Sequence, residues 1–590
     1  MVVIANSKRF FFSFYTALFV SCFFSSSAQY KLSVNFCSGE KNISPEMEKM
    51  LPHAKDFRDS LSRTRELQKI IDDFRKEGFL SAGIDSLYKD SALLTVCIHA
   101  GIKYNWLRLR PGTVDEGILR AAGFNEKILS GKIIDYTKVA KVIEKILTWC
   151  ENNGYPFAAV RLDSVEIQEE AVSAQLNLTR NQIIKIDSVK VYGNATISAS
   201  YLHSYLSIKP GDLYNESLIR DVQARVREIV FVKEVKPLNV VFSEGRARVE
   251  LFLENRRASQ FDLVVGIVPP PETSPGKYEL TGDARLKLIN SFGQGELIDL
   301  NWKKPQALSQ DLKVRFIYPF LFSTPLGIDL FLSIYKQDTT YIDVVRTLGL
   351  QYIIHGNNSL KAFISIKESN LLSAEAFQFS TTLPAFADIT TTQYGLAFHA
   401  EKLDYRLNPR RGFSVDADTR IGDKTIHKNA ELNPVVYDSL ELRSTQYYVT
   451  AGGDYFVPVG KQSTVTAGIK SAYQHSPVIF RNELFRIGGL RTVRGYDEES
   501  VYASFYLIGN LEYRFLLEQN SYLLAFVNRA YFKDESRNAP VASGDLLGFG
   551  GGITFETRLG IFSFIYALGR ENQQVLVRNG KIHFGLISTF

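Results

Sequence analysis

The chain ends with the stretch KIHFGLISTF (residues 581–590), in which apolar side chains recur at almost every second position. On an extended strand, successive side chains point to opposite faces of the sheet. One face of this strand would carry Ile582, Phe584, Leu586 and Phe590, with Ser588 among them. The other face would carry His583, Gly585, Ile587 and Thr589. One apolar face and a terminal phenylalanine are typical of the last strand of a β-barrel whose outer surface faces lipid.

The same alternation extends toward the N-terminus and fills residues 257–590, where short segments are broken by Gly, Asn, Asp and Pro. Two clear examples are Tyr394/Leu396/Phe398 and Phe562/Phe564/Tyr566/Leu568. At roughly 20 residues per strand and loop, the region would form about 16 strands, which is a usual number for outer-membrane barrels. We therefore predict an antiparallel transmembrane β-barrel over residues 257–590. A soluble β-sandwich or propeller would leave the terminal strand unexplained.

The composition fits a barrel better than a bundle of membrane helices. The mean hydropathy is −0.07, and alternating strands dilute the average in this way. The 29 Tyr and 41 Phe fit the aromatic girdles of such barrels. Pro319, Pro325, Gly327 and Asp329 interrupt the apolar stretch 316–335, which predicts two strands and not a membrane helix. The net charge of +6 comes from interleaved charges, so we expect no nucleic-acid binding.

The N-terminus carries a targeting signal. Lys8 and Arg9 precede the apolar run 10–24, and the small residues before Gln29 suit cleavage after Ala28. This pattern predicts a secretory signal peptide over residues 1–28. Cys22 leaves a lipoprotein signal as a weaker alternative, because the residue three before it is a phenylalanine.

Three cysteines remain after cleavage, and an odd number cannot pair completely within one chain. Cys37 and Cys97 lie on candidate strands of the first small domain and could form a disulfide in an oxidising periplasm. Three buried free thiols, including Cys150, are the slightly favoured expectation. No cysteine and histidine spacing indicates a metal site, so we expect no metal and no cofactor.

Before residue 257, helical and strand patterns alternate in a repeat of roughly 75 residues, which indicates an array of small units. The units span residues 29–103, 104–183 and 184–256. The third is the clearest, and its order is β-α-α-β-β. Its predicted elements are a strand at 186–191, helices at 198–206 and 215–230, and strands at 235–242 and 248–254. The second unit repeats this order well and the first more weakly.

These units resemble polypeptide-transport-associated (POTRA) domains. The resemblance rests on "VKVYGN", "LSIKPGDLYN" and "VFVKEV" in the third unit, on "ENNGYPFAAVRL" in the second and on "FRKEGFLSAGIDSL" in the first. It implies that an exposed sheet edge pairs with extended segments of unfolded outer-membrane or secreted polypeptides. A periplasmic or inner-membrane partner could also dock on these domains. The alternative is that they are rigid spacers.

The stretch RIGGLRTVRGYDEES (residues 486–500) resembles the signature loop of the BamA/TamA superfamily. The hallmark Val-Arg-Gly-Phe/Tyr stands here as Val493, Arg494, Gly495 and Tyr496. The resemblance implies that this loop folds into the barrel lumen, where the arginine contacts the inner wall. A guanidinium offers five donors, so it can pin a loop to several acceptors.

This sequence departs from the family at the partner of that arginine. The strand after "NLEYRFLL" usually carries an Asp that meets the loop arginine, but Asn528 stands there. An amide still accepts a hydrogen bond, although the charge-assisted pair is lost. Glu512 or Glu556 could substitute if either side chain points inward.

The resemblance implies an outer-membrane protein, with its N-terminal half in the periplasm, that inserts or translocates polypeptides without catalysis. Three units resemble the layout of TamA most closely. A client strand would enter at the seam between the first and last strands, marked by Val264, Gly585, Leu586 and Phe590. The alternatives are a transporter for two-partner secretion and a passive pore or structural surface protein. An enzyme is the poorest interpretation, because no GxSxG, HExxH or Walker motif is present.

Overall fold

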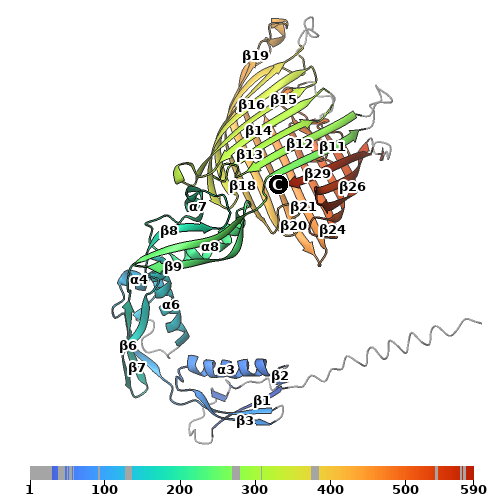
Figure 1. Cartoon of the computed structure of the whole chain (residues 1–590). Helices are drawn as coiled ribbons and strands as arrows, with labels where there is room; N and C mark the ends of the chain where they lie inside the picture. The colour runs from blue at the N-terminus through green and yellow to red at the C-terminus, as the bar shows by residue number, and fades with distance from the viewer. Residues whose placement is uncertain are drawn as a thin grey trace, which may run out of the picture. The chain divides into compact units, whose positions relative to one another are not determined.

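The computed structural model describes residues 30–37, 47–48, 51, 56–57, 59–90, 93–126, 136–268, 279–306, 308–373, 384–537, 543–571, 574–575 and 580–590 (Figure 1). The predicted signal peptide, residues 1–28, lies outside these residues. The chain divides into two compact units, one of residues 1–185, 211–217 and 243–247, the other of 186–210, 218–242 and 248–590. Among the described helices, none combines the length and apolar character needed to cross a membrane.

The first domain pairs one long helix with a four-stranded sheet of order β2-β1-β4-β3. Asp59 caps helix α3, because its Oδ1 accepts the backbone N–H of Ser62 at 2.7 Å. Leu67, Ile70 and Phe74 recur at helical spacing, and they pack on the sheet as one buried cluster. The elements are β1 (Tyr30–Phe36), β2 (Asp56–Phe57), α3 (Ser60–Lys76), β3 (Gly83–Asp90) and β4 (Leu93–His99).

A disulfide joins Cys37 to Cys97 in this domain, with Cα atoms 5.2 Å apart. The expectation of three free thiols is therefore wrong for these two residues. Strands β1 and β4 run parallel with Phe36 opposite Ile98, so the residue after β1 reaches the partner strand. The two cysteines are 60 residues apart in sequence, and only this pairing of strands brings them together. Cys150 is free and buried, and burial raises the pKa of its thiol.

The second and third domains both follow the predicted order β-α-α-β-β, and the last strand of each lies in the middle of its sheet. In β10, alternate residues Val249, Leu251 and Leu253 are buried, as the sequence pattern predicts. The second domain contains β5 (Asn105–Arg110), α4 (Glu116–Ala122), α6 (Tyr136–Asn152), β6 (Ala159–Gln168) and β7 (Ala171–Thr179). The third contains β8 (Lys185–Tyr192), α7 (Ala199–Leu206), α8 (Glu216–Glu228), β9 (Val232–Ser243) and β10 (Arg246–Asn255).

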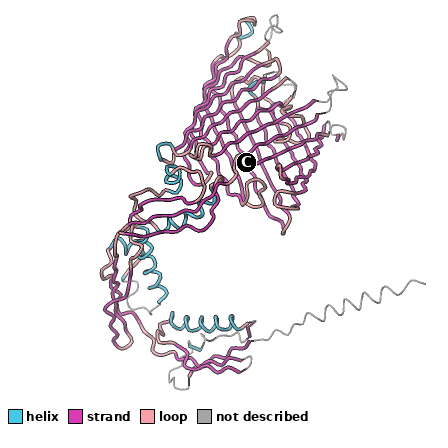
Figure 2. Tube along the Cα trace, viewed as in Figure 1, coloured by secondary structure: helices cyan, strands magenta, loops and turns pink. Residues whose placement is uncertain are grey.

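The remaining chain closes into an antiparallel barrel of 16 strands, which confirms the predicted fold class (Figure 2). Neighbouring strands are hydrogen-bonded in chain order, and the last strand returns to the first. The strands are β11 (Gln260–Val268), β12 (Glu279–Ile289), β13 (Leu297–Lys304), β14 (Gln310–Tyr318), β15 (Leu326–Gln337), β16 (Tyr341–His355), β17 (Asn358–Leu371), β18 (Asp388–Leu403), β19 (Gly412–His427), β20 (Arg443–Val459), β21 (Ser463–His475), β24 (Phe505–Leu516), β25 (Tyr522–Lys533), β26 (Ser543–Thr557), β27 (Gly560–Glu571) and β29 (Lys581–Thr589), with the short β28 (Gln574–Val575) beside β27.

Side chains alternate between the two faces of the barrel wall. In β25, Phe526 and Asn528 are buried toward the lumen, whereas Val527 and Tyr531 lie on the exposed outer face. In β29, the outward Phe584 is 54% exposed and the inward His583 is 6% exposed, as the terminal alternation predicts. The stretch 316–335 supplies the end of β14 and most of β15, so it forms two strands as expected.

Candidate functional site

A long loop between β21 and β24, residues 476–504, packs on the inner wall of the barrel; we call it the lumenal loop. It contains a small hairpin of β22 (Phe485–Ile487) and β23 (Val501–Ala503). Val493 is fully buried in one cluster with Ile508 of β24 and Ala530 of β25. The loop motif therefore lies against inward-facing residues of two consecutive strands.

Arg494 is the polar anchor of this loop and is only 9% exposed. Its Nη1 donates to Glu512 Oε2 at 2.9 Å, its Nη2 to Asn510 Oδ1 at 3.0 Å and its Nε to Asn528 Oδ1 at 3.2 Å. The guanidinium carbon also lies 3.8 Å from the centre of the Phe526 ring. One side chain thus makes three hydrogen bonds and a cation–π contact to adjacent strands.

The structure brings together two of the three candidate partners of Arg494. Glu512 and Asn528 bind it directly, whereas Glu556 accepts a hydrogen bond from Asn520 at 3.1 Å. Glu556 was therefore the wrong candidate, and its side chain is exposed at the end of β26. Asn510 was missed, and its signal was present in the sequence: it stands two residues before Glu512, on the same face of the same strand.

The backbone of the motif lies directly on strands β26 and β27. A Cβ on Gly548 would overlap the carbonyl oxygen of Arg494, and a Cβ on Gly495 would overlap the carbonyl of Leu568. Gly495 also has φ +98°, a conformation that L side chains rarely adopt. The Tyr496 hydroxyl donates to the carbonyl of Arg570 at 2.7 Å. The glycine run that begins at Gly548 thus lets the loop approach the wall closely.

A second anchor holds the lumenal loop near its first end. Lys424 of β19 and Glu483 form a buried ion pair of 2.6 Å, with side chains 0% and 3% exposed. Gln446 of β20 donates to Glu483 Oε1 at 3.0 Å, and the Lys424 ammonium also donates to the carbonyl of Val478. Sequence reasoning missed this pair, because nothing in the primary structure couples two residues 59 positions apart.

The predicted seam is closed in the structure. Strands β11 and β29 lie side by side (Figure 1). They pair over eight residue pairs, from Gln260↔Thr589 to Ile267↔Ile582, without a register shift. Val264 lies opposite Gly585, and Leu263 lies opposite Leu586. A Cβ on Gly585 would meet the Ser563 hydroxyl of β27, so the glycine gives room for that neighbour. The terminal Phe590 donates its backbone N–H to the carbonyl of Ser259 at 3.0 Å.

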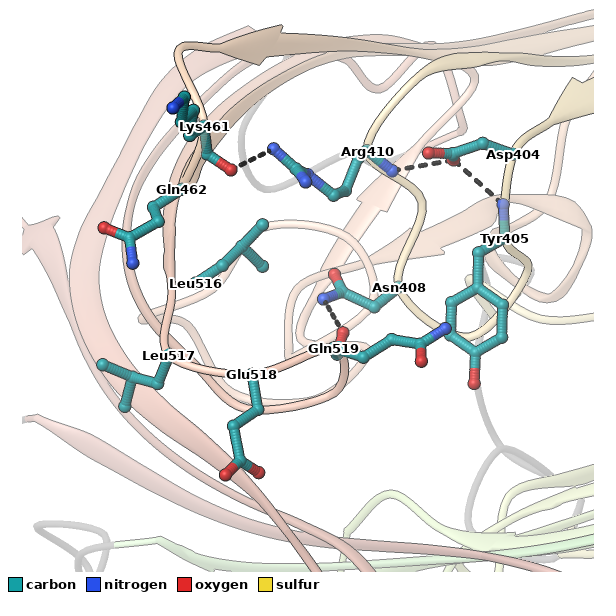
Figure 3. Close-up of a pocket in the computed structure, with 10 residues that line it drawn as sticks. All are labelled: Asp404, Tyr405, Asn408, Arg410, Lys461, Gln462, Leu516, Leu517, Glu518 and Gln519. Atoms are coloured by element: carbon teal, nitrogen blue, oxygen red, sulfur yellow. Dashed lines mark hydrogen bonds between the residues drawn. The ribbon is translucent and has the colours of Figure 1, made fainter.

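Three turns at one end of the barrel line an open pocket of about 430 Å³ (Figure 3). They join β18 to β19, β20 to β21 and β24 to β25. Arg410 Nη2 donates to the carbonyl of Lys461 at 2.8 Å, and Asn408 Nδ2 donates to the carbonyl of Gln519 at 2.9 Å. The lining carries both acidic and basic side chains, so its charge selects no ligand. These bonds tie the three turns together.

Comparisons with known proteins agree with this geometry. Residues 290–590 match the model of the Omp85 superfamily domain, and residues 184–254 match a POTRA model described as a surface antigen variable number repeat. None of the curated protein sequences matches the chain.

The solved structures to which this chain is similar are distant in sequence. CdiB from Acinetobacter baumannii is 12% identical, with a TM-score of 0.54 and coverage of 83% of this chain and 90% of that one. CdiB from Escherichia coli is 12% identical, with a TM-score of 0.52 and coverage of 93% and 99%. BamA from Haemophilus ducreyi lacking POTRA domains 1–3 is 14% identical, with a TM-score of 0.46 and coverage of 83% and 100%. With its barrel and its match over residues 290–590, the chain belongs to the Omp85 superfamily of non-enzymatic bacterial outer-membrane β-barrels with periplasmic POTRA domains, which act on polypeptide clients.

Proposed function

We propose that this protein inserts or translocates client polypeptides by pairing a client strand with an edge of the barrel at the β11–β29 seam. The observation that carries the proposal is that the first and last strands of the barrel meet at this seam. Eight residue pairs join β11 to β29, and these strands have no turn connecting them along the chain. Pairs of strands near the seam are about as short, with eight residue pairs between β12 and β13 and seven between β27 and β29, so the missing connection and not the length distinguishes the seam. Opening it exposes unpaired backbone groups in the membrane, and a client strand would satisfy them. Backbone pairing of this kind places few demands on client sequence.

The N-terminal half supports a role in receiving clients. We propose three POTRA domains at residues 29–103, 104–183 and 184–256, a layout closest to TamA that favours an accessory role beside a main assembly factor. In the second domain, β5 and β6 are the two edges of the sheet. Val165 and Ile167 of β6 are 53% and 62% exposed. An edge strand with exposed apolar side chains suits pairing with an extended client.

The passive-pore interpretation receives less support from the lumen. The lumenal loop is anchored at both Glu483 and Arg494, and both anchors are buried. A loop held in this way occupies space that a water-filled channel would need.

The test is to lock the seam with a disulfide. Leu263→Cys and Leu586→Cys stand opposite each other, and Cys37, Cys97 and Cys150 would be replaced in the same background. We expect cross-linked protein to lose client assembly, measured as folded outer-membrane proteins in cells, and a reductant to restore it.

The matched control is a disulfide between β12 and β13, at Leu286→Cys and Leu300→Cys, which also stand opposite each other. This pair of strands need not separate, so the control should keep full activity. If the seam lock is efficient and client assembly continues, the edge route is refuted. A route through the lumen, as in a polypeptide secretion transporter, would then be favoured.

A further inference from the structure

The lumenal loop touches both sides of the seam. On one side it is fixed to the strands that precede β29 in the chain, through Arg494 on β24 and β25 and Tyr496 on β27. Asp497 adds a salt bridge of 2.6 Å to Lys581, the first residue of β29. This side of the barrel carries the last strand, so the loop moves with the last strand as long as these bonds hold.

On the other side, the same loop is fixed to the strands that follow β11. Lys303 of β13 lies between two loop carboxylates, at 2.9 Å from Glu498 Oε2 and 2.9 Å from Glu499 Oε1. Arg491 of the loop makes a salt bridge of 2.9 Å to Asp283 of β12. We call these contacts, of Lys303 and Asp283 with the loop, the latch. They lie beside the seam, because Asp283 is opposite both Lys303 and Val264 in the strand register.

Burial makes the loss of one latch partner more costly than the loss of a partner in a surface ion pair. The side chain of Lys303 is 15% exposed, and those of Glu498 and Glu499 are 11% and 14% exposed. Removing the ammonium would leave two carboxylates shielded from water with one fewer cation, which is costly. The Arg491 side chain is 51% exposed, so its salt bridge to Asp283 contributes less.

Side-chain packing between the two sides of the seam and the lumenal loop is incomplete at this point. A cavity of about 20 Å³, the size of a single water, is lined by Val264 of β11, by Asp283 and Lys303, by the loop and by His583 of β29. Among the described atoms, His583 Nε2 is buried and makes no hydrogen bond. Ionic contacts therefore bridge the walls where side-chain packing leaves a gap.

We propose that the lumenal loop is a strap across the inside of the seam, and that the seam opens only when the latch releases. The strap joins the wall that carries β29 to the wall that carries β11, so separating these strands requires one set of contacts to break. The latch is the side that releases, because its Arg491 side chain is 51% exposed, whereas Arg494 on the other side is 9% exposed and makes three hydrogen bonds. The inference rests on the proposed function in one respect only: the proposed function gives the reason why the seam would open.

The test measures opening without any client. Hydrogen–deuterium exchange of β11 and β29 in the purified full-length protein in lipid nanodiscs reports separation of these strands, because their shared backbone bonds must break first. Lys303→Gln should accelerate exchange there on the order of tenfold relative to wild type, and exchange in β25 should not change. Lys361→Gln is the matched control. It removes another shielded lumenal ammonium, 19% exposed and paired with Asp329, from strands far from the seam in the barrel order.

A second pair of variants, which swaps the charges of Asp283 and Arg491, tests the latch even if the Lys303→Gln protein does not fold. Asp283→Arg alone should accelerate exchange at the seam, and adding Arg491→Asp should return it toward the wild-type rate. The latch is refuted if β11 and β29 of a folded Lys303→Gln protein exchange hydrogen at the wild-type rate. It is also refuted if adding Arg491→Asp to Asp283→Arg does not slow hydrogen exchange at the seam. The two proposals can fail separately. If Lys303→Gln exchanges faster at the seam but the protein with the disulfide-locked seam still assembles clients, the latch stands and only the proposed function is refuted.

Discussion

Replacing Arg494 by alanine should release the lumenal loop while the barrel wall stays intact. The change removes three hydrogen bonds and a cation–π contact, and one of those bonds is an ion pair with the buried Glu512. Breaking one partner of a buried ion pair costs about 3–5 kcal/mol. Glu512 keeps its 2.7 Å bond to Arg514, and water can enter the vacated space, so the lower end applies.

A loss of about 3 kcal/mol raises the undocked fraction of the loop on the order of a hundredfold. The assay is hydrogen–deuterium exchange of residues 485–503, where the backbone N–H groups of Gly489 and Leu490 are bonded within the loop. Exchange of β25 should not change, because its pairing with β24 and β26 does not involve the arginine side chain.

Arg529→Ala provides the matched control for this experiment. Arg529 also lies on β25 but points outward, with its side chain 74% exposed, and it pairs with Asp545. Its loss should cost less than about 1 kcal/mol. The reasoning is refuted if Arg494→Ala leaves the exchange of residues 485–503 unchanged. Client assembly should fall with the released loop, and normal client levels would argue that docking of the loop is not needed.

Three other changes test separate parts of the structure. Gly548→Ala should accelerate exchange of the lumenal loop, because the added Cβ meets the carbonyl of Arg494, whereas Gly551→Ala, whose Cβ has more room, should have less effect. Cys97→Ser should make hydrogen exchange in β1 and β4 faster by removing the disulfide to Cys37. An unchanged exchange rate would show that strand pairing alone holds β1 and β4 together. Asp59→Ala should weaken α3 near pH 7. Hydrogen bonds from Ser62 lower the pKa of the Asp59 carboxyl from its ordinary value of 3.8. The difference in stability between the wild type and the variant should therefore be full above pH 3.8 and shrink as the carboxyl protonates below it. A difference that stays constant with pH would contradict this.

Local patterns in the sequence were enough for the element types and the class of fold. Alternation in residues such as Phe584 and His583 assigns each side chain of a strand to one face, because a strand has a period of two. The same reasoning places Glu512 and Asn510 on one face, although only the first was selected. Helices in the N-terminal domains follow from caps and apolar spacing, which act over a few residues.

Contacts between distant segments needed the tertiary structure. The pairing of Cys37 with Cys97, the Lys424–Glu483 anchor and the contacts of Lys303 with the loop each join residues that no local pattern relates. The choice of Glu512 over Glu556 likewise depended on where the loop crosses the wall. By itself, the sequence determined the order of strands, the face of each side chain and the identity of the loop motif. Only the closed barrel decided which side chains meet, because closure fixes the register between the first and last strands and brings both beside one loop.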